Sequence, residues 1–214
     1  MHVTLTEAGA YVEWLRQAVH ELQLPPSTRT RAAAACFAIA QEHHHAIVRL
    51  IEEQLCASGF ALLRVGLEAY VRGQWLSLLA TDEEVERVAR GAEPPGFSAL
   101  ARQLETTNAF SDGLLSSIKQ QCWSSLCDYT HTGGRHLQRW QTTDSVESNY
   151  SREEVIEVLA FAEAIGFMAA IGIAGLAGND QLALTILNAF KERTESSSAT
   201  TRQPTWPQPL PPRI

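Results

Sequence analysis

A short window near the middle of the chain gathers side chains suited to a phosphate-bearing substrate. The window 124–140 contains two histidines, two arginines and a tryptophan, which are His131, His136, Arg135, Arg139 and Trp140. An imidazole gives or takes a proton near neutral pH, a guanidinium binds phosphate, and an indole stacks on a nucleobase. These residue types suit a phosphate and a stacked base.

His131 is the candidate general base of this window. Asp128 precedes it by three residues, so in a helix the carboxylate lies on the same side and can orient the imidazole. The opposite face of that helix is predicted to be an apolar seam of Leu115, Ile118, Cys122, Leu126 and Tyr129. Gly133 and Gly134 predict the end of the helix. In the alternative interpretation, Asp128 and His131 form a solvated helix-end pair and the glycines are a plain stop.

The residues after the glycine pair form two pairs with a spacing of four. Arg135 and Arg139 make one pair, and His136 and Trp140 make the other. If the helix resumes there, each pair shares a side, and the resulting basic and aromatic cluster would hold a phosphate and a stacked base. Arginine packed on Trp140 as a structural cation–π contact is the competing explanation.

Residues 58–80 are apolar nearly all round, which predicts a central helix. Arg64, Glu68 and Arg72 interrupt this pattern at every fourth position and therefore lie on one stripe. Buried charges are kept when they are paired, so a structural ion-pair ladder explains them. In the functional interpretation, Arg64 and Glu68 line a pocket, and Arg64 stabilises the charge on the phosphate if its stripe faces that of Asp128 and His131.

The remaining candidate ligands do not predict a metal site. Consecutive helical positions are 100° apart, so His43–His45 cannot converge on one ion. Glu42 and His45 form a single Glu-x-x-His, whereas a di-iron bundle needs two. We therefore expect no metal and no cofactor, with His44 on the apolar face as a hydrogen-bonded histidine in the core or at an interface. The four cysteines form no CxxC pair, and we expect them to be reduced thiols.

The hydrophobic periodicity predicts an all-α bundle of about seven or eight helices. The expected helices start near Thr4, Thr28, Ser58, Thr81, Phe97, Ser111, Ser151 and Asn179. Capping boxes are expected at Thr4, Thr81 and Ser151. We place one helical domain at residues 1–193 and a disordered tail rich in Ser, Thr and Pro at residues 194–214.

Composition and charge limit the functional classes. The 214 residues are 45% apolar with a net charge of −7, which argues against non-specific binding to nucleic acid. No secretory signal is seen at the N-terminus, and we expect a cytoplasmic protein. The apolar stretch 164–178 is shorter than the roughly 20 residues needed to cross a bilayer. Because small residues recur there at every fourth position, we expect a buried or dimer-facing helix.

Two of these segments carry a family resemblance. Residues 62–69, with Arg64 and Glu68, followed by residues 128–134, resemble bacterial helical domains of unknown function related to the HEPN superfamily. The resemblance implies a helical bundle, often dimeric, in toxin-antitoxin, abortive-infection and other defence systems. Some members are metal-independent ribonucleases that place an arginine a few residues before a histidine. In this chain those positions hold Ser124, Ser125 and Leu126.

Two functional hypotheses follow. In the first, the protein is a metal-independent endoribonuclease with His131 as base, Asp128 as its orienting group and Arg64, beside Glu68, as the positive charge. Arg135, His136, Arg139 and Trp140 would bind the substrate. In the second, the same cleft belongs to a non-catalytic module that binds a partner protein or a small ligand. Under both hypotheses we expect a homodimer without a membrane anchor.

Overall fold

The computed structural model describes residues 5–198, and every helix or strand assigned within that range is an α-helix. The predicted all-α class is therefore confirmed. Ten helices are found in this range: α1 (Leu5–Val19), α2 (Thr28–Glu52), α3 (Cys56–Leu78), α4 (Asp82–Ala89), α5 (Phe97–Leu104), α6 (Leu114–Gln121), α7 (Trp123–Thr130), α8 (Gly134–Gln138), α9 (Arg152–Leu176) and α10 (Asp180–Ser198).

The difference from the expected seven or eight helices lies in residues 111–140. One helix was expected there, but its backbone bends at Cys122 into α6 and α7. The bend separates the helix axes while Leu115, Cys122, Leu126 and Tyr129 of the predicted seam remain buried. After Thr132, which has a left-handed φ of 54°, the chain resumes as α8. A brief resumption after the glycine pair was one of the predicted possibilities.

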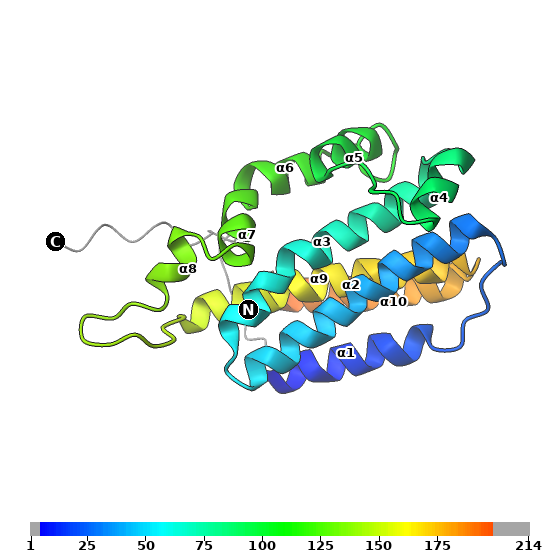
Figure 1. Cartoon of the computed structure of the whole chain (residues 1–214). Coiled ribbons are helices and arrows are strands. Elements are labelled where there is room, and N and C mark those ends of the chain that lie inside the picture. The colour runs from blue at the N-terminus through cyan, green and yellow to red at the C-terminus, as the bar shows by residue number, and fades with distance from the viewer. Residues whose placement is uncertain (1–4, 199–214) are drawn as a thin grey trace.

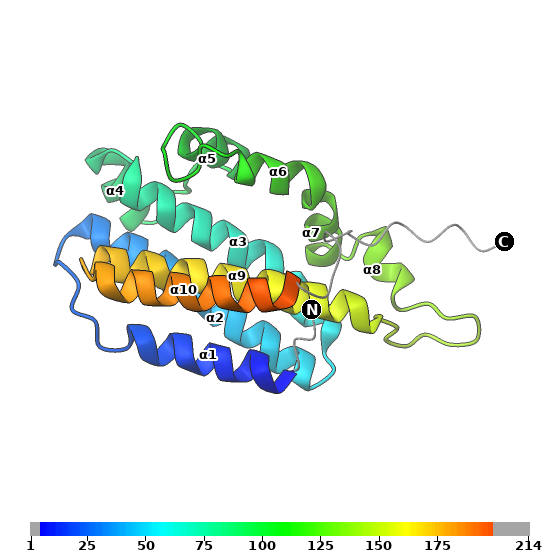
Figure 2. The same cartoon turned by 180° about the vertical axis from the view of Figure 1, so that it is seen from behind.

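The long helices form the body of the molecule. In Figures 1 and 2, α1, α2, α3, α9 and α10 run side by side along one direction. The central helix α2 packs chiefly on α3 and α9. The short helices α5, α6 and α7 cover α3 on the side away from α1, and α8 with the following loop projects from one end (Figure 1).

Close packing of the three central helices depends on glycine. The Phe37 ring on α2 is 1% exposed and lies between Gly73 of α3 and Gly172 of α9. A β-carbon would come within 2.6 Å of that ring at Gly73 and within 2.7 Å at Gly172. Any larger residue would have to move a fully packed aromatic side chain, which cores tolerate poorly.

His44 lies in this core, as its spacing predicted. It is 3% exposed, packs against Gly166 of α9, and its Nε2 atom has no hydrogen-bond partner in the described part of the chain. Burial disfavours the charged imidazole and lowers the pKa of His44 to about 4. The ring is therefore neutral at physiological pH.

The capping boxes predicted at the starts of helices are confirmed where they fall within the described residues. Thr81 and Ser151 both form the predicted capping boxes, with Glu84 and Glu154, whereas Thr4 lies outside the described residues. Among residues 5–198, α9 alone is long and apolar enough to cross a bilayer by length and composition. Of its most apolar 18-residue stretch, 61% is buried in the bundle, as in a core helix.

The last helix is longer than expected. The predicted tail began at residue 194, but α10 continues to Ser198, since extending an existing helix costs little. Residues 199–214, the rest of the predicted tail, lie outside the described residues.

Candidate active site on α3 and α7

Arg64 and His131 meet although 67 residues separate them in the chain. Arg64 lies in the first half of α3, and His131 caps the C-terminal end of α7. The Arg64 Nη1 atom is 2.7 Å from Nε2 of His131. A guanidinium can only donate, so Nε2 is the acceptor and the proton of the neutral ring sits on Nδ1. Arg64 of the predicted charged stripe therefore meets His131 of the predicted Asp128–His131 stripe.

Glu68 holds the arginine from the other side. Arg64 Nε donates to Glu68 Oε1 at 2.9 Å, and Arg72 donates to Glu68 Oε2 at 3.2 Å. This is the ion-pair ladder predicted for α3. The side chains of Arg64 and Glu68 are 23% and 16% exposed, so the pair lines the surface and is not sealed in the core. The structural and the functional interpretation of the ladder are both compatible with this geometry.

Trp123 and Lys119 complete the arrangement, and neither was predicted from the sequence. The Arg64 guanidinium carbon lies 5.0 Å from the centroid of the Trp123 ring, and Lys119 Nζ lies 3.9 Å from it. The spacing of four between Lys119 and Trp123 was a usable signal for a cation–π pair on one helix. Neither residue belongs to the predicted apolar seam or to the predicted stripe of Asp128 and His131.

These side chains form one surface, which we call the cationic face. Its members are Arg64, Glu68, Arg72, Lys119, Trp123 and His131. Three permanent cations face one carboxylate, in a chain whose formal net charge is −7. Such a local excess concentrates anions at the surface and opposes the repulsion from the rest of the molecule.

Asp128 does not contact His131. Its carboxylate Oδ2 lies 3.6 Å from Arg135 Nε, and Arg135 Nη1 also donates to Ser125 Oγ at 2.6 Å. The turn that brings Arg135 back toward Asp128 begins at the left-handed Thr132. The His131 ring therefore makes its polar contact with Arg64, and Asp128 binds Arg135.

Arg139 is held in an ion pair of low exposure. Its Nε donates to Glu154 Oε1 at 2.6 Å, and the side chains of Arg139 and Glu154 are 12% and 7% exposed. Glu154 also accepts from the backbone N–H of Ser151 in the capping box of α9. The pair thus anchors the end of α8 to the start of α9.

His136 and Trp140 differ in how far they are exposed to solvent. His136 is 7% exposed and packs edge-on against Tyr129 and Tyr150, with ring centroids 5.6 and 6.2 Å apart. Neither ring nitrogen has a hydrogen-bond partner among the described residues. Burial raises the pKa of Tyr150 to about 12, so its phenol is neutral. Trp140, by contrast, is 38% exposed.

We call this second group the α8 junction. Its members are Asp128, Arg135, His136, Arg139, Tyr150 and Glu154. The structure engages both of its arginines with carboxylates and turns its imidazole inward. The substrate-binding role of Arg135, His136, Arg139 and Trp140 stays a prediction, and binding by either arginine would first require an ion pair to open.

Neither group is accompanied by a metal cluster in the described part of the chain. Within residues 5–198 no three or more His, Cys, Asp or Glu side chains are grouped so that they could hold a metal ion.

Comparison with known families places the chain in a group without an assigned activity. Residues 37–195 match the model of a family of unknown function, DUF6988. The chain belongs to this family. No curated protein and no solved structure matches it significantly. The matched range contains the whole cationic face and the whole α8 junction, so both groups are part of the DUF6988 region.

Membership of DUF6988 fits the expectation of a helical domain of unknown function but names no reaction. The side chains of the cationic face themselves indicate which reactions this region can support. An imidazole with an accepting Nε2, a neighbouring guanidinium and two further cations can bind a phosphate and accept a proton beside it.

Proposed function

We propose that the DUF6988 region of this chain binds single-stranded RNA at the cationic face and cleaves it without a metal ion. The observation that carries the proposal is the 2.7 Å contact between Arg64 Nη1 and His131 Nε2. It joins a proton acceptor to a permanent positive charge at a surface where cations are in excess.

The first step is the capture of a phosphodiester. Arg64, Arg72 and Lys119 supply the positive charge, and arginine suits a phosphate because its N–H groups bind two oxygens in parallel. When the Arg64 guanidinium turns to the phosphate, it releases Nε2 of His131. Glu68 holds Arg64 at Nε during this change and keeps the guanidinium oriented.

The second step is transesterification within the RNA. His131 Nε2 takes the proton of the 2′-hydroxyl, whose oxygen attacks the adjacent phosphorus. The bond from phosphorus to the 5′-oxygen breaks, and that oxygen takes a proton from water. The products are a 2′,3′-cyclic phosphate and a 5′-hydroxyl, and the protonated imidazole later returns its proton to solvent. Arg64 stabilises the negative charge on the phosphorane.

The proposal includes the relationship to the HEPN superfamily and a toxin-like role in a defence system. Its support is the resemblance of residues 62–69 and 128–134, together with the meeting of Arg64 and His131. The arginine would then come from α3 and not from the helix that carries the histidine. A homodimer belongs to the same proposal, supported by the exposed Leu137, Trp140 and Val146 beside the projecting α8.

The test is RNA cleavage in excess EDTA. We expect the purified wild-type chain to release fragments with 2′,3′-cyclic phosphate ends, and His131→Ala or Arg64→Ala to slow this by about 100-fold or more. Two exposed positions outside the face serve as matched controls, His20→Ala for the imidazole and Arg90→Ala for the guanidinium. Both controls should keep the wild-type rate.

A second function is favoured by one feature of the same face. Glu68 already engages Arg64 and Arg72, and the face has a single imidazole, so a non-catalytic module that binds an anionic partner fits as well. In that case the wild-type chain leaves RNA intact in the cleavage assay, while Arg64→Ala and His131→Ala weaken binding only. Toxicity on expression that His131→Ala relieves would favour the nuclease.

A further inference from the structure

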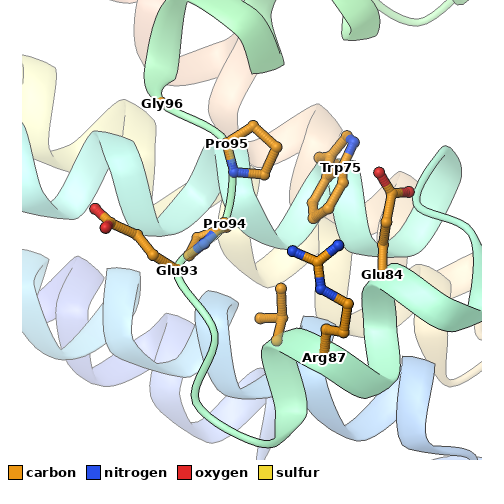
Figure 3. A pocket seen from close by; sticks show the side chains of 8 residues that line it. Trp75, Glu84, Arg87, Glu93, Pro94, Pro95 and Gly96 are labelled. Atoms are coloured by element: carbon orange, nitrogen blue, oxygen red, sulfur yellow. The ribbon is translucent and has the colours of Figure 1, made fainter.

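A separate cavity of about 360 Å³ opens beside the C-terminal half of α3 (Figure 3). Its walls come from α3, from α4 and from the segment 93–96 that leads into α5. It is lined by Trp75, Glu84, Arg87, Val88, Glu93, Pro94, Pro95 and Gly96. None of the six residues of the cationic face lines it, so it is a second candidate site.

Arg87 supplies the positive charge in the lining of this cavity. Figure 3 shows its side chain extending from α4 toward the ring of Trp75. Among residues 5–198 no hydrogen bond or ion pair of the Arg87 guanidinium is seen, whereas Arg90, one turn later, pairs with Glu86 at 3.3 Å. An anionic group entering the cavity would find this guanidinium free.

Part of the wall of this cavity is apolar. Trp75 donates its indole N–H to Gln103 Oε1 at 2.8 Å, so it offers only carbon to a ligand. The rings of Pro94 and Pro95 and the side chain of Val88 add to this surface. Proline rings lose little conformational freedom on binding, which suits them to hold an apolar group.

The carboxylates of Glu84 and Glu93 limit which kind of anion can bind in the cavity. Glu84 uses Oε2 to accept from the backbone N–H of Thr81, which leaves Oε1 available, and Glu93 also lines the cavity. The negative charges of Glu84 and Glu93 in the lining repel a polyanion such as a nucleotide. They favour a ligand that brings an ammonium group with its carboxylate. The volume is at the lower end for ligand pockets and suits a small molecule.

We propose that this cavity binds a free α-amino acid with an apolar side chain. The ligand carboxylate pairs with Arg87, its ammonium group pairs with Glu84 Oε1, and its side chain packs on Pro94, Pro95 and Val88. This inference does not depend on RNA cleavage. It assigns the DUF6988 region a small-molecule site at the end of α3 remote from His131.

The test is calorimetric titration of the full chain with L-phenylalanine and L-leucine. We expect saturable binding of at least one of them, and at least tenfold weaker binding of the matching amide, which lacks the carboxylate. N-acetylation, which removes the ammonium charge, should also weaken binding. Arg87→Gln should weaken binding at least tenfold, and Arg90→Gln, just beyond the same helix, should leave it unchanged.

The absence of saturable binding for both amino acids would overturn the proposal. So would equal affinity for the amide, or an Arg87→Gln variant that binds like the wild type. The unfolding midpoint of Arg87→Gln is measured alongside, and it should match that of the wild type because Arg87 is exposed. If that variant is unstable, the comparison of amino acid with amide on the wild-type chain still decides.

Discussion

The cationic face and the α8 junction contain similar residues in different electrostatic states. At the α8 junction, Arg135 and Arg139 each meet a carboxylate, and His136 is enclosed by tyrosines. At the cationic face, Arg64 and Arg72 share the carboxylate of Glu68, Lys119 lies against Trp123, and His131 is exposed. The junction is assembled from nearby residues and stabilises a connection, whereas the face joins distant segments and keeps an excess of charge. Function is therefore better sought at the face.

The largest expected effect on stability comes from removing the Arg139–Glu154 ion pair of the α8 junction. Arg139→Ala leaves Glu154 without its charged partner, and we expect a loss of about 3 kcal/mol in the free energy of unfolding. Urea unfolding measures this loss, with Arg90→Ala as the exposed control, expected below about 1 kcal/mol. A loss for Arg139→Ala no larger than for the control would mean that the junction is not a structural anchor.

The buried His44 gives an effect of similar size that depends on pH. Its folded pKa of about 4 lies below the ordinary value of 6.5, so the unfolded chain binds more protons between these pH values. Stability should therefore fall as pH drops from about 6.5 to 4, by up to about 3 kcal/mol from this group. His44→Leu should remove that part of the dependence.

Unfolding free energies of the wild type and His44→Leu at several pH values provide the check. The gap between the two curves should change across this range. Parallel curves would show that the core imidazole does not titrate with a depressed pKa.

The smallest expected effect on stability is at the face itself. Arg64→Ala breaks a partly exposed pair within one helix, and we expect a cost of about 0.5 kcal/mol. The same substitution should reduce RNA cleavage or anion binding far more than it reduces stability. A loss above about 3 kcal/mol in urea unfolding would instead make Arg64 a structural anchor, as Arg139 is at the α8 junction.

The helices and their buried sides were predictable because their signals are local. The seam through Leu115, Cys122, Leu126 and Tyr129 and the caps at Thr81 and Ser151 depend only on residues within a few positions. The meeting of Arg64 and His131 was predicted only as a possibility, on the condition that the charged stripe of the central helix faces the stripe of Asp128 and His131. Whether the two side chains come within hydrogen-bond distance could be seen only in the tertiary structure.

Other features of the site could not be predicted, because packing between helices decides them. No glycine or proline marks the bend at Cys122, which ended the continuous helix. The inward direction of His136 follows from how the five-residue α8 docks, and not from its own sequence. Asp128 was expected to orient His131, but the left-handed turn at Thr132 brings Arg135 to it. Lys119 and Trp123 do carry a local signal, which is their spacing of four on one helix.

The most direct measurement of the central claim is long-range proton–nitrogen NMR of the His131 ring. We predict that Nε2 of His131 carries no proton and accepts from Arg64, with the ring proton on Nδ1. Arg64→Ala should shift the Nε2 resonance, whereas Arg135→Ala should leave it in place. A proton on Nε2, or a resonance that does not respond to Arg64→Ala, would show that the two residues do not form one site.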